Sequence, residues 1–136
     1  MKPNIQCRKR GGRRGAAVVE FAVCLPVMLL IVLGSIEAAS MLFLRQALIQ
    51  SAYEGAKVAI RDNGNNADAT TAIANVADGR RLNDVAVEFS PKNVGKAKQG
   101  EFVSVTISVP GDSNSFIPFG PFKNRVVSAR AVMVKE

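Results

Sequence analysis

Few residues of this 136-residue chain have side chains suited to catalysis or metal binding. There is no His, and the two cysteines, Cys7 and Cys24, both lie near the N-terminus. Elsewhere only Ser, Thr, Lys, Tyr53 and scattered carboxylates remain, and they form no nucleophile and base pair. The oxygen-rich stretch 62–66 lacks the ligand order of a calcium loop. The sequence therefore predicts no enzyme activity, no cofactor and no metal site.

The most informative single residue is Glu20, the only charged residue of the apolar run 16–36. An ionised carboxylate inside hydrocarbon costs about 2.5–3.5 kcal/mol on insertion scales unless it is paired or near an interface. One interpretation is that Glu20, one turn from the membrane edge, reaches the lipid headgroups. The other is that cleavage after Gly15 leaves a new α-amine on Ala16, and that an ammonium of a neighbouring subunit neutralises the carboxylate.

The apolar run that carries Glu20 is long enough to cross a bilayer. Residues 16–36 would form a helix of roughly 31 Å, which matches a hydrocarbon thickness of about 30 Å. In a secretory signal peptide the small residues of the cleavage site follow the apolar core, whereas here Gly15 and its small neighbours precede it. Cleavage at these residues would leave the helix attached as an anchor.

The formal net charge of +7 is concentrated in the first fifteen residues, which contain six basic residues and no acid. The rest of the chain holds twelve basic against eleven acidic residues, so no basic face for nucleic acid is implied. A basic leader before an apolar run instead orients the N-terminus toward the cytoplasm. The remaining hundred residues are then expected outside the cytoplasm.

Beyond the apolar run, the segment 37–61 has the pattern of an amphipathic helix. One side is apolar or small, and the opposite side is polar. The apolar side comprises Met41, Leu44, Leu48, Ala52, Gly55 and Ala59, and the polar stripe comprises Gln46, Gln50, Glu54, Lys57 and Arg61. This helical stalk needs a partner surface, either its own C-terminal domain or a neighbouring helix in a filament, and both can hold at once.

The C-terminal segment 62–136 is expected to form a small α+β domain. Residues 67–78 are compatible with a short helix, with Asn66 as its cap and Gly79 as its stop. Three β-rich runs follow, at 85–89, 103–109 and 126–134. The stretch 91–100 between the first two runs is expected to be a solvated hairpin loop.

A Pro- and Gly-rich loop between the last two strands holds three phenylalanines, Phe116, Phe119 and Phe122. If they are exposed, they form a docking patch for a partner subunit. The alternative is that they cover the open edge of the sheet or fill its core.

The N-terminal half of the chain resembles the TadE-like pseudopilins of tight-adherence (Flp-type) pilus systems. The resemblance rests on the stretch 13–22, Arg-Arg-Gly-Ala-Ala-Val-Val-Glu-Phe-Ala, and on shorter matches downstream. These are Leu25-Pro26, Gly34, Glu37, Arg45-Gln46-Ala47 and Glu54-Gly55-Ala56-Lys57. The match is strong over residues 13–60 and looser beyond.

The resemblance implies that a prepilin peptidase cuts between Gly15 and Ala16, and that Glu20, followed by Phe21, acts in assembly. The expected organisation is a cleaved leader at 1–15, a transmembrane helix at 16–36, the stalk at 37–61 and an extracytoplasmic domain at 62–136. The expected partners are the prepilin peptidase, other pseudopilins, the assembly platform and the inner membrane, with no nucleic acid.

A different class of protein also fits these features: an uncleaved, membrane-anchored binding module that recognises an envelope component. Leader processing distinguishes the two interpretations. Roles in adhesion, secretion and uptake all stay open, as does a place in the filament, at its tip or in the platform.

Overall fold

The structure is a computed structural model that describes residues 13–114 and 124–136. The chain divides into two compact units, Met1–Ile36 and Glu37–Glu136. The first helix, α1 (Arg13–Ala59), is 47 residues long and begins in the first unit and ends in the second. Its only proline among the described residues, Pro26, lies inside the first unit, where the helix is assigned without interruption.

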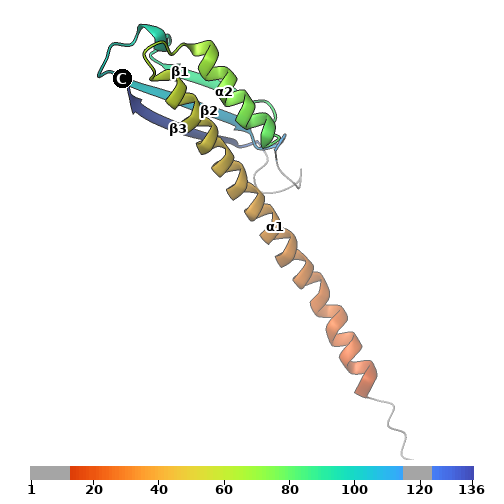
Figure 1. The fold of residues 1–136 in the computed structure, drawn as a ribbon. Helices are drawn as coiled ribbons and strands as arrows, with labels where there is room; N and C mark the ends of the chain where they lie inside the picture. The colour runs from red at the N-terminus through yellow and green to blue at the C-terminus, as the bar shows by residue number, and fades with distance from the viewer. Residues whose placement is uncertain (1–12, 115–123) are drawn as a thin grey trace, which may run out of the picture. The chain divides into compact units, whose positions relative to one another are not determined.

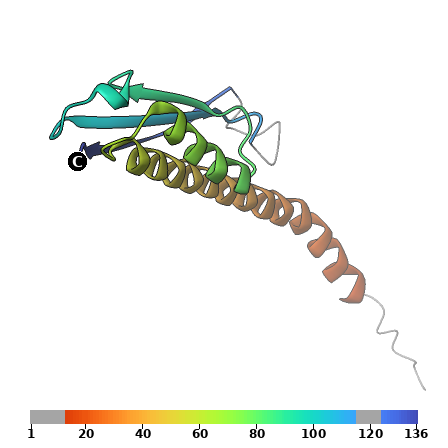
Figure 2. The same ribbon diagram turned by 45° about the horizontal axis from the view of Figure 1, so that its top comes forward.

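The second unit is an α+β domain with two layers, as the sequence predicts. After α1 come α2 (Asn66–Gly79), β1 (Ala86–Ser90), a short 3₁₀ helix η1 (Val94–Lys96), β2 (Phe102–Pro110) and β3 (Val126–Val134). The strands form an antiparallel sheet in the order β1-β2-β3 (Figure 1). Within this unit both helices cover the same face of the sheet (Figure 2).

Strand β2 is the centre of the core because it pairs on both sides and alternates strictly. Val103, Val105, Ile107 and Val109 are all fully buried under the helices. In the register, Ile107 lies between Val87 of β1 and Ala129 of β3. The β-rich run predicted at 103–109 is therefore confirmed as a strand, with alternate apolar side chains facing the core.

The part of α1 that belongs to the domain packs on the domain itself. Leu44, Leu48, Ala52 and Ala56 of α1 share one hydrophobic cluster with Ile73 of α2 and the inward side chains of the sheet. The predicted apolar side is thus buried, while Gln46, Gln50, Lys57 and Arg61 of the polar stripe are exposed and Glu54 is half-buried. Of the two partner surfaces considered for the stalk, the structure shows the chain's own domain.

Two glycines of the domain, Gly55 and Gly64, allow other parts of the chain to approach their backbone closely. A Cβ on Gly55 would lie 2.5 Å from Cδ1 of Ile73, so the glycine allows α2 to pack closely on α1. A Cβ on Gly64 would lie 2.5 Å from the carbonyl oxygen of Val58 and 2.6 Å from that of Ala59. The chain can therefore reverse tightly after α1 only with glycine at position 64.

The ends of α2 differ from the sequence-based expectation by one or two residues. The N-cap is Asn65, whose Oδ1 accepts from the amide of Asp68 at 2.8 Å, and not Asn66. Asn66 instead donates to the carbonyl of Lys92 and accepts from the amide of Val94. At the other end, Gly79 is the last residue of α2 and Arg80 is its C-cap, one residue beyond the predicted stop. The left-handed residue that follows the cap is Arg81, with φ 56°.

The loop between β1 and β2 is also more than a solvated turn. It contains η1, and Val94 is fully buried in a second cluster with Ala59, Ala69 and Val103. The Asn66 side chain, which donates one hydrogen bond to this loop and accepts another from it, holds the loop against the start of α2. The prediction of an ordinary hairpin loop is therefore wrong at Val94, whose side chain fills the core beside β2.

A buried lysine closes the end of the domain where α1 stops. Lys135, only 5% exposed, donates from Nζ to the carbonyl of Ala59 at 3.1 Å and to that of Arg61. These carbonyls lie at the C-terminal end of α1, where the helix dipole favours a cation. Backbone hydrogen bonds from Lys135 to Glu101 and from Glu136 to Ile60 complete the closure.

Candidate functional site

The N-terminal half of α1 exposes every side chain that the structure describes there. From Gly15 to Ile36 no residue is buried, and Phe21 and Val18 are 60% and 67% exposed. The helix from Gly15 contains an 18-residue window with a mean hydropathy of 2.7, none of it buried. A helix that is apolar on all sides requires either lipid or other helices around it. By length and composition this helix can span a membrane.

Glu20 lies in the second turn of the segment that begins at Gly15. It is four residues after Ala16, so the two are neighbours on one helix face and differ by about 6 Å along the axis. In the uncut chain Ala16 contributes an ordinary amide nitrogen. Cleavage between Gly15 and Ala16 would convert that nitrogen to an ammonium one turn from the carboxylate.

Nothing in the described structure requires glycine at position 15. A Cβ built on Gly15 meets no atom within 4 Å, and the same is true of Gly34. Glycine in a helix interior costs about 0.5–1 kcal/mol relative to Ala. Gly55 and Gly64 have packing reasons inside the domain, whereas Gly15 has none there. Recognition by a peptidase would be a reason for Gly15 that lies outside the fold.

The three phenylalanines proposed as partner contacts, Phe116, Phe119 and Phe122, lie outside the described residues. The described ends of their loop are tied together, because Gly111 donates to the carbonyl of Arg125 at 2.7 Å. In addition, the amide of Asn124 donates to Oδ1 of Asp112 at 2.7 Å. These hydrogen bonds therefore hold the C-terminal end of β2 next to the N-terminal end of β3, where the loop begins and ends.

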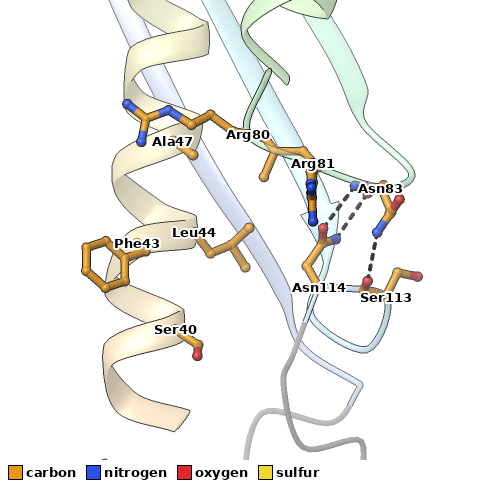
Figure 3. A pocket seen from close by; sticks show the side chains of 10 residues that line it. Ser40, Phe43, Leu44, Ala47, Arg80, Arg81, Asn83, Ser113 and Asn114 are labelled. Atoms are coloured by element: carbon orange, nitrogen blue, oxygen red, sulfur yellow. Dashed lines mark hydrogen bonds between the residues drawn. The ribbon is translucent and has the colours of Figure 1, made fainter. Parts of the chain in front are cut away.

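A polar network joins the loop after α2 to the loop after β2. The side chain of Asn114 accepts from the amide of Asn83 and donates to its carbonyl, at 2.9 and 3.1 Å. Asn83 in turn donates from its side chain to the carbonyl of Ser113 (Figure 3). These hydrogen bonds fix three residues, Asn83, Ser113 and Asn114, that line a pocket of about 430 Å³.

The pocket is lined by apolar residues and by two cationic ones. Phe43, Leu44 and Ala47 of α1 are apolar, and Arg80 and Arg81 follow α2. The side chain of Arg80 extends to α1, where it donates to Gln50, whereas that of Arg81 lies beside Asn114 (Figure 3). Sequence analysis did not single out this arginine pair. The signal in the sequence was two consecutive arginines directly after the expected end of the helix at Gly79.

The described residues offer no arrangement for metal chemistry. No group of three or more His, Cys, Asp or Glu side chains lies together in residues 13–114 and 124–136. No buried side-chain nitrogen or oxygen atom of these ranges lacks a hydrogen-bond partner. The chemical features that stand out are therefore Glu20 on the apolar helix and the arginine pair of the pocket.

Helix and domain together define a class: a protein with one N-terminal membrane-type helix that continues into a small α+β domain. Residues 15–57 match the model of the TadE-like protein family, which confirms the resemblance drawn from the sequence. The match covers the apolar run and most of the domain half of α1, and it ends before α2. No curated protein and no solved structure matches the chain. The family match and the apolar helix support a protein associated with tight-adherence pili.

Proposed function

We propose that the chain is a minor pseudopilin of a tight-adherence pilus system and acts by assembly, without catalysing a reaction. It is inserted in the inner membrane by residues 16–36 with its N-terminus in the cytoplasm, and a prepilin peptidase removes residues 1–15. The domain lies on the opposite side of the membrane. The processed helix then packs with other pseudopilins and with the assembly platform.

The observation that carries this proposal is Glu20 on an otherwise apolar, fully exposed helix that matches the TadE-like family. A carboxylate at this position is tolerable in hydrocarbon once a cation neutralises it. The α-ammonium of Ala16 on a neighbouring processed subunit is a suitable cation. Phe21, beside Glu20 and 60% exposed, offers apolar surface to the same neighbour. Cleavage would thus make packing in the assembly favourable.

The first experiment determines the N-terminal residue of the protein purified from cells, by intact mass and terminal peptide mapping. It is done with and without the candidate prepilin peptidase, and on the variants Gly15→Ala and Gly34→Ala. Gly34 is the matched control because it is also a helical glycine with no atom near its Cβ position. We expect a peptidase-dependent start at Ala16 that Gly15→Ala abolishes and Gly34→Ala leaves unchanged.

The alternative function gives the opposite result in the same experiment. A membrane-anchored binding module that recognises an envelope component would retain residues 1–15 and stay functional with the leader attached. A chain that starts upstream of Ala16 in the presence of the active peptidase would overturn the pseudopilin mechanism.

A second experiment tests the role of the carboxylate after cleavage. Glu20→Gln keeps the size of the side chain and removes its charge, so we expect normal processing but loss of incorporation into pili or their assembly complex. Glu88→Gln is the control, because Glu88 is an exposed acid on β1 of the domain. Equal incorporation of Glu20→Gln and wild type would contradict charge pairing at this position.

A further inference from the structure

We infer that the pocket between α1 and the loop after α2 binds the phosphate group of an anionic phospholipid headgroup. The inference rests on the membrane insertion in the proposed function, but not on cleavage or pilus assembly. Its cationic residues, Arg80 and Arg81, lie outside the family match at residues 15–57 and have no role in the proposed mechanism.

The first observation is the charge of the pocket. Its charged lining residues are Arg80 and Arg81, and no acid is among the residues that form its wall. Arg80 uses one of its five donors on Oε1 of Gln50, at 2.6 Å, and Arg81 makes no side-chain hydrogen bond or ion pair with any described residue. The guanidinium of Arg81 has spare donors suited to bidentate contacts with phosphate oxygens, and Arg80 adds a second positive charge to the lining.

The second observation is the backbone of Arg81. Its amide donates to Asp78, and the next amide, of Leu82, donates to Ala77 at 2.9 Å, which is the hydrogen-bond pattern of a left-handed helix end. Glycine is strongly preferred at that position, yet the chain has arginine there with φ 56°. Among the described residues, no side-chain hydrogen bond or ion pair accompanies this conformation, which makes Arg81 a residue to test for function.

Two other non-glycine residues of the described ranges have a positive φ, and both lie in loops that follow α2 or precede β3. They are Asp84 and Asn124, with φ 56° and 60°. Both are residue types that adopt this conformation more readily than Arg does. Oδ2 of Asp84 accepts from Oγ of Ser113 at 2.7 Å, so the nearest acid of this loop is engaged by a hydroxyl. This carboxylate is therefore already hydrogen-bonded and is not among the residues that line the pocket.

The third observation indicates a lipid and not free phosphate. The lining that comes from α1 is mostly apolar, with Phe43, Leu44 and Ala47, which suits the glycerol and upper acyl carbons that accompany a headgroup phosphate. Ser40, also in the lining, comes four residues, or about 6 Å of helix, after Ile36, the end of the apolar run. Along the chain, the lining therefore begins shortly after the apolar run that the proposed function places in the membrane.

The test uses the purified full chain in neutral detergent, titrated with short-chain phosphatidylglycerol, short-chain phosphatidylcholine or inorganic phosphate. Bound lipid is counted by native mass spectrometry, and NMR follows the Nε–H of Arg81 and the side-chain amides of Asn83 and Asn114. We expect phosphatidylglycerol to bind and shift these signals, and phosphatidylcholine and millimolar phosphate to do neither. Equal binding of phosphatidylcholine would overturn the inference, and so would phosphate that binds as tightly as phosphatidylglycerol.

The decisive variant is Arg81→Gly, because it removes the guanidinium and places the preferred residue at the left-handed position. Its domain should be at least as stable as wild type, while its dissociation constant for phosphatidylglycerol should rise about ten-fold or more. Lys92→Gln and Lys98→Gln, two exposed lysines outside the pocket, are the controls and should bind as wild type does. Equal weakening by the controls would show a diffuse charge effect and overturn a defined site.

Membrane insertion is measured separately, by whether the full chain stays with bilayers at alkaline pH. A chain that is extracted would overturn the proposed function. A chain that stays in the bilayer and shows no preference for phosphatidylglycerol would overturn only the pocket.

Discussion

The two halves of α1 are one continuous helix, yet they bury opposite amounts of side chain. Between Gly15 and Ile36 no described side chain is buried, whereas between Glu37 and Ala59 a buried position recurs at nearly every turn. Leu48, Ala52, Ala56 and Ala59 are at most 1% exposed. The first half is apolar on all sides and the second on one side only.

The comparison shows that hydrophobic pattern, and not helix formation, decides the environment of each half. Large apolar side chains exposed to water along a whole helix would form a patch that a soluble domain does not tolerate. The half with a single apolar face can instead close a core with three strands and α2. Each prediction below changes one residue of the domain. The free energy of unfolding is measured by hydrogen exchange of the β2 amides, with the full chain in detergent.

The largest difference between the halves should appear for leucine truncation. Leu48→Ala leaves a cavity where the side chain is fully buried, so we expect the domain to lose about 2–5 kcal/mol. Leu30→Ala is the matched control, because Leu30 is 71% exposed on the first half. Equal losses from the two variants would contradict the division of α1 into an exposed and a packed half.

The buried lysine at the end of α1 should give the next largest effect. Lys135→Met keeps the aliphatic chain but removes the donor to the carbonyls of Ala59 and Arg61, which costs about 1.5–3 kcal/mol for a charged hydrogen-bond donor. Lys98→Met is the control, because Lys98 is exposed, and it should change the stability of the domain little. If Lys135→Met were as stable as wild type, the ammonium would not be closing the helix end.

Two glycines of the domain should respond to alanine with opposite signs. Gly64→Ala forces a Cβ against the carbonyls of Val58 and Ala59, and overpacking of this kind costs about 1–3 kcal/mol. Gly79→Ala meets no atom within 4 Å and replaces a helical glycine, so it should gain up to about 1 kcal/mol. A loss for both variants would mean that the end of α2 is not helical at Gly79.

Much of the fold could be predicted from the sequence because local patterns determine it. The boundaries of β3 match the predicted run 126–134 because its β-branched and apolar composition needs no tertiary information, and the buried face of α1 follows from helical spacing. Val94 was missed because a single apolar residue in a polar loop carries no periodic signal. The pocket was missed because α1, the loop after α2 and the loop after β2 contribute to it from distant parts of the sequence.

The candidate assembly residues are a different case, because the sequence predicts their chemistry better than the fold can. Gly15 and Glu20 lie on the exposed half of α1, as expected from the apolar run. No contact among the described residues assigns a role to either of them. Their function depends on a peptidase and on neighbouring subunits, which a single chain does not contain. The roles of Gly15, Ala16, Glu20 and Phe21 therefore stay predictions.

The smallest effect expected here concerns two adjacent asparagines that sequence alone could not rank. Asn65 caps α2 through the amide of Asp68, so Asn65→Ala should cost about 1 kcal/mol and speed hydrogen exchange in the first turn of α2. Asn66 instead binds Lys92 and Val94, so Asn66→Ala should speed exchange at the Val94 amide and release the η1 loop. Both side chains can cap a helix in isolation, and only contacts distant in sequence assign them different tasks. Identical exchange patterns in the two variants would show that the loop is held by burial of Val94 alone.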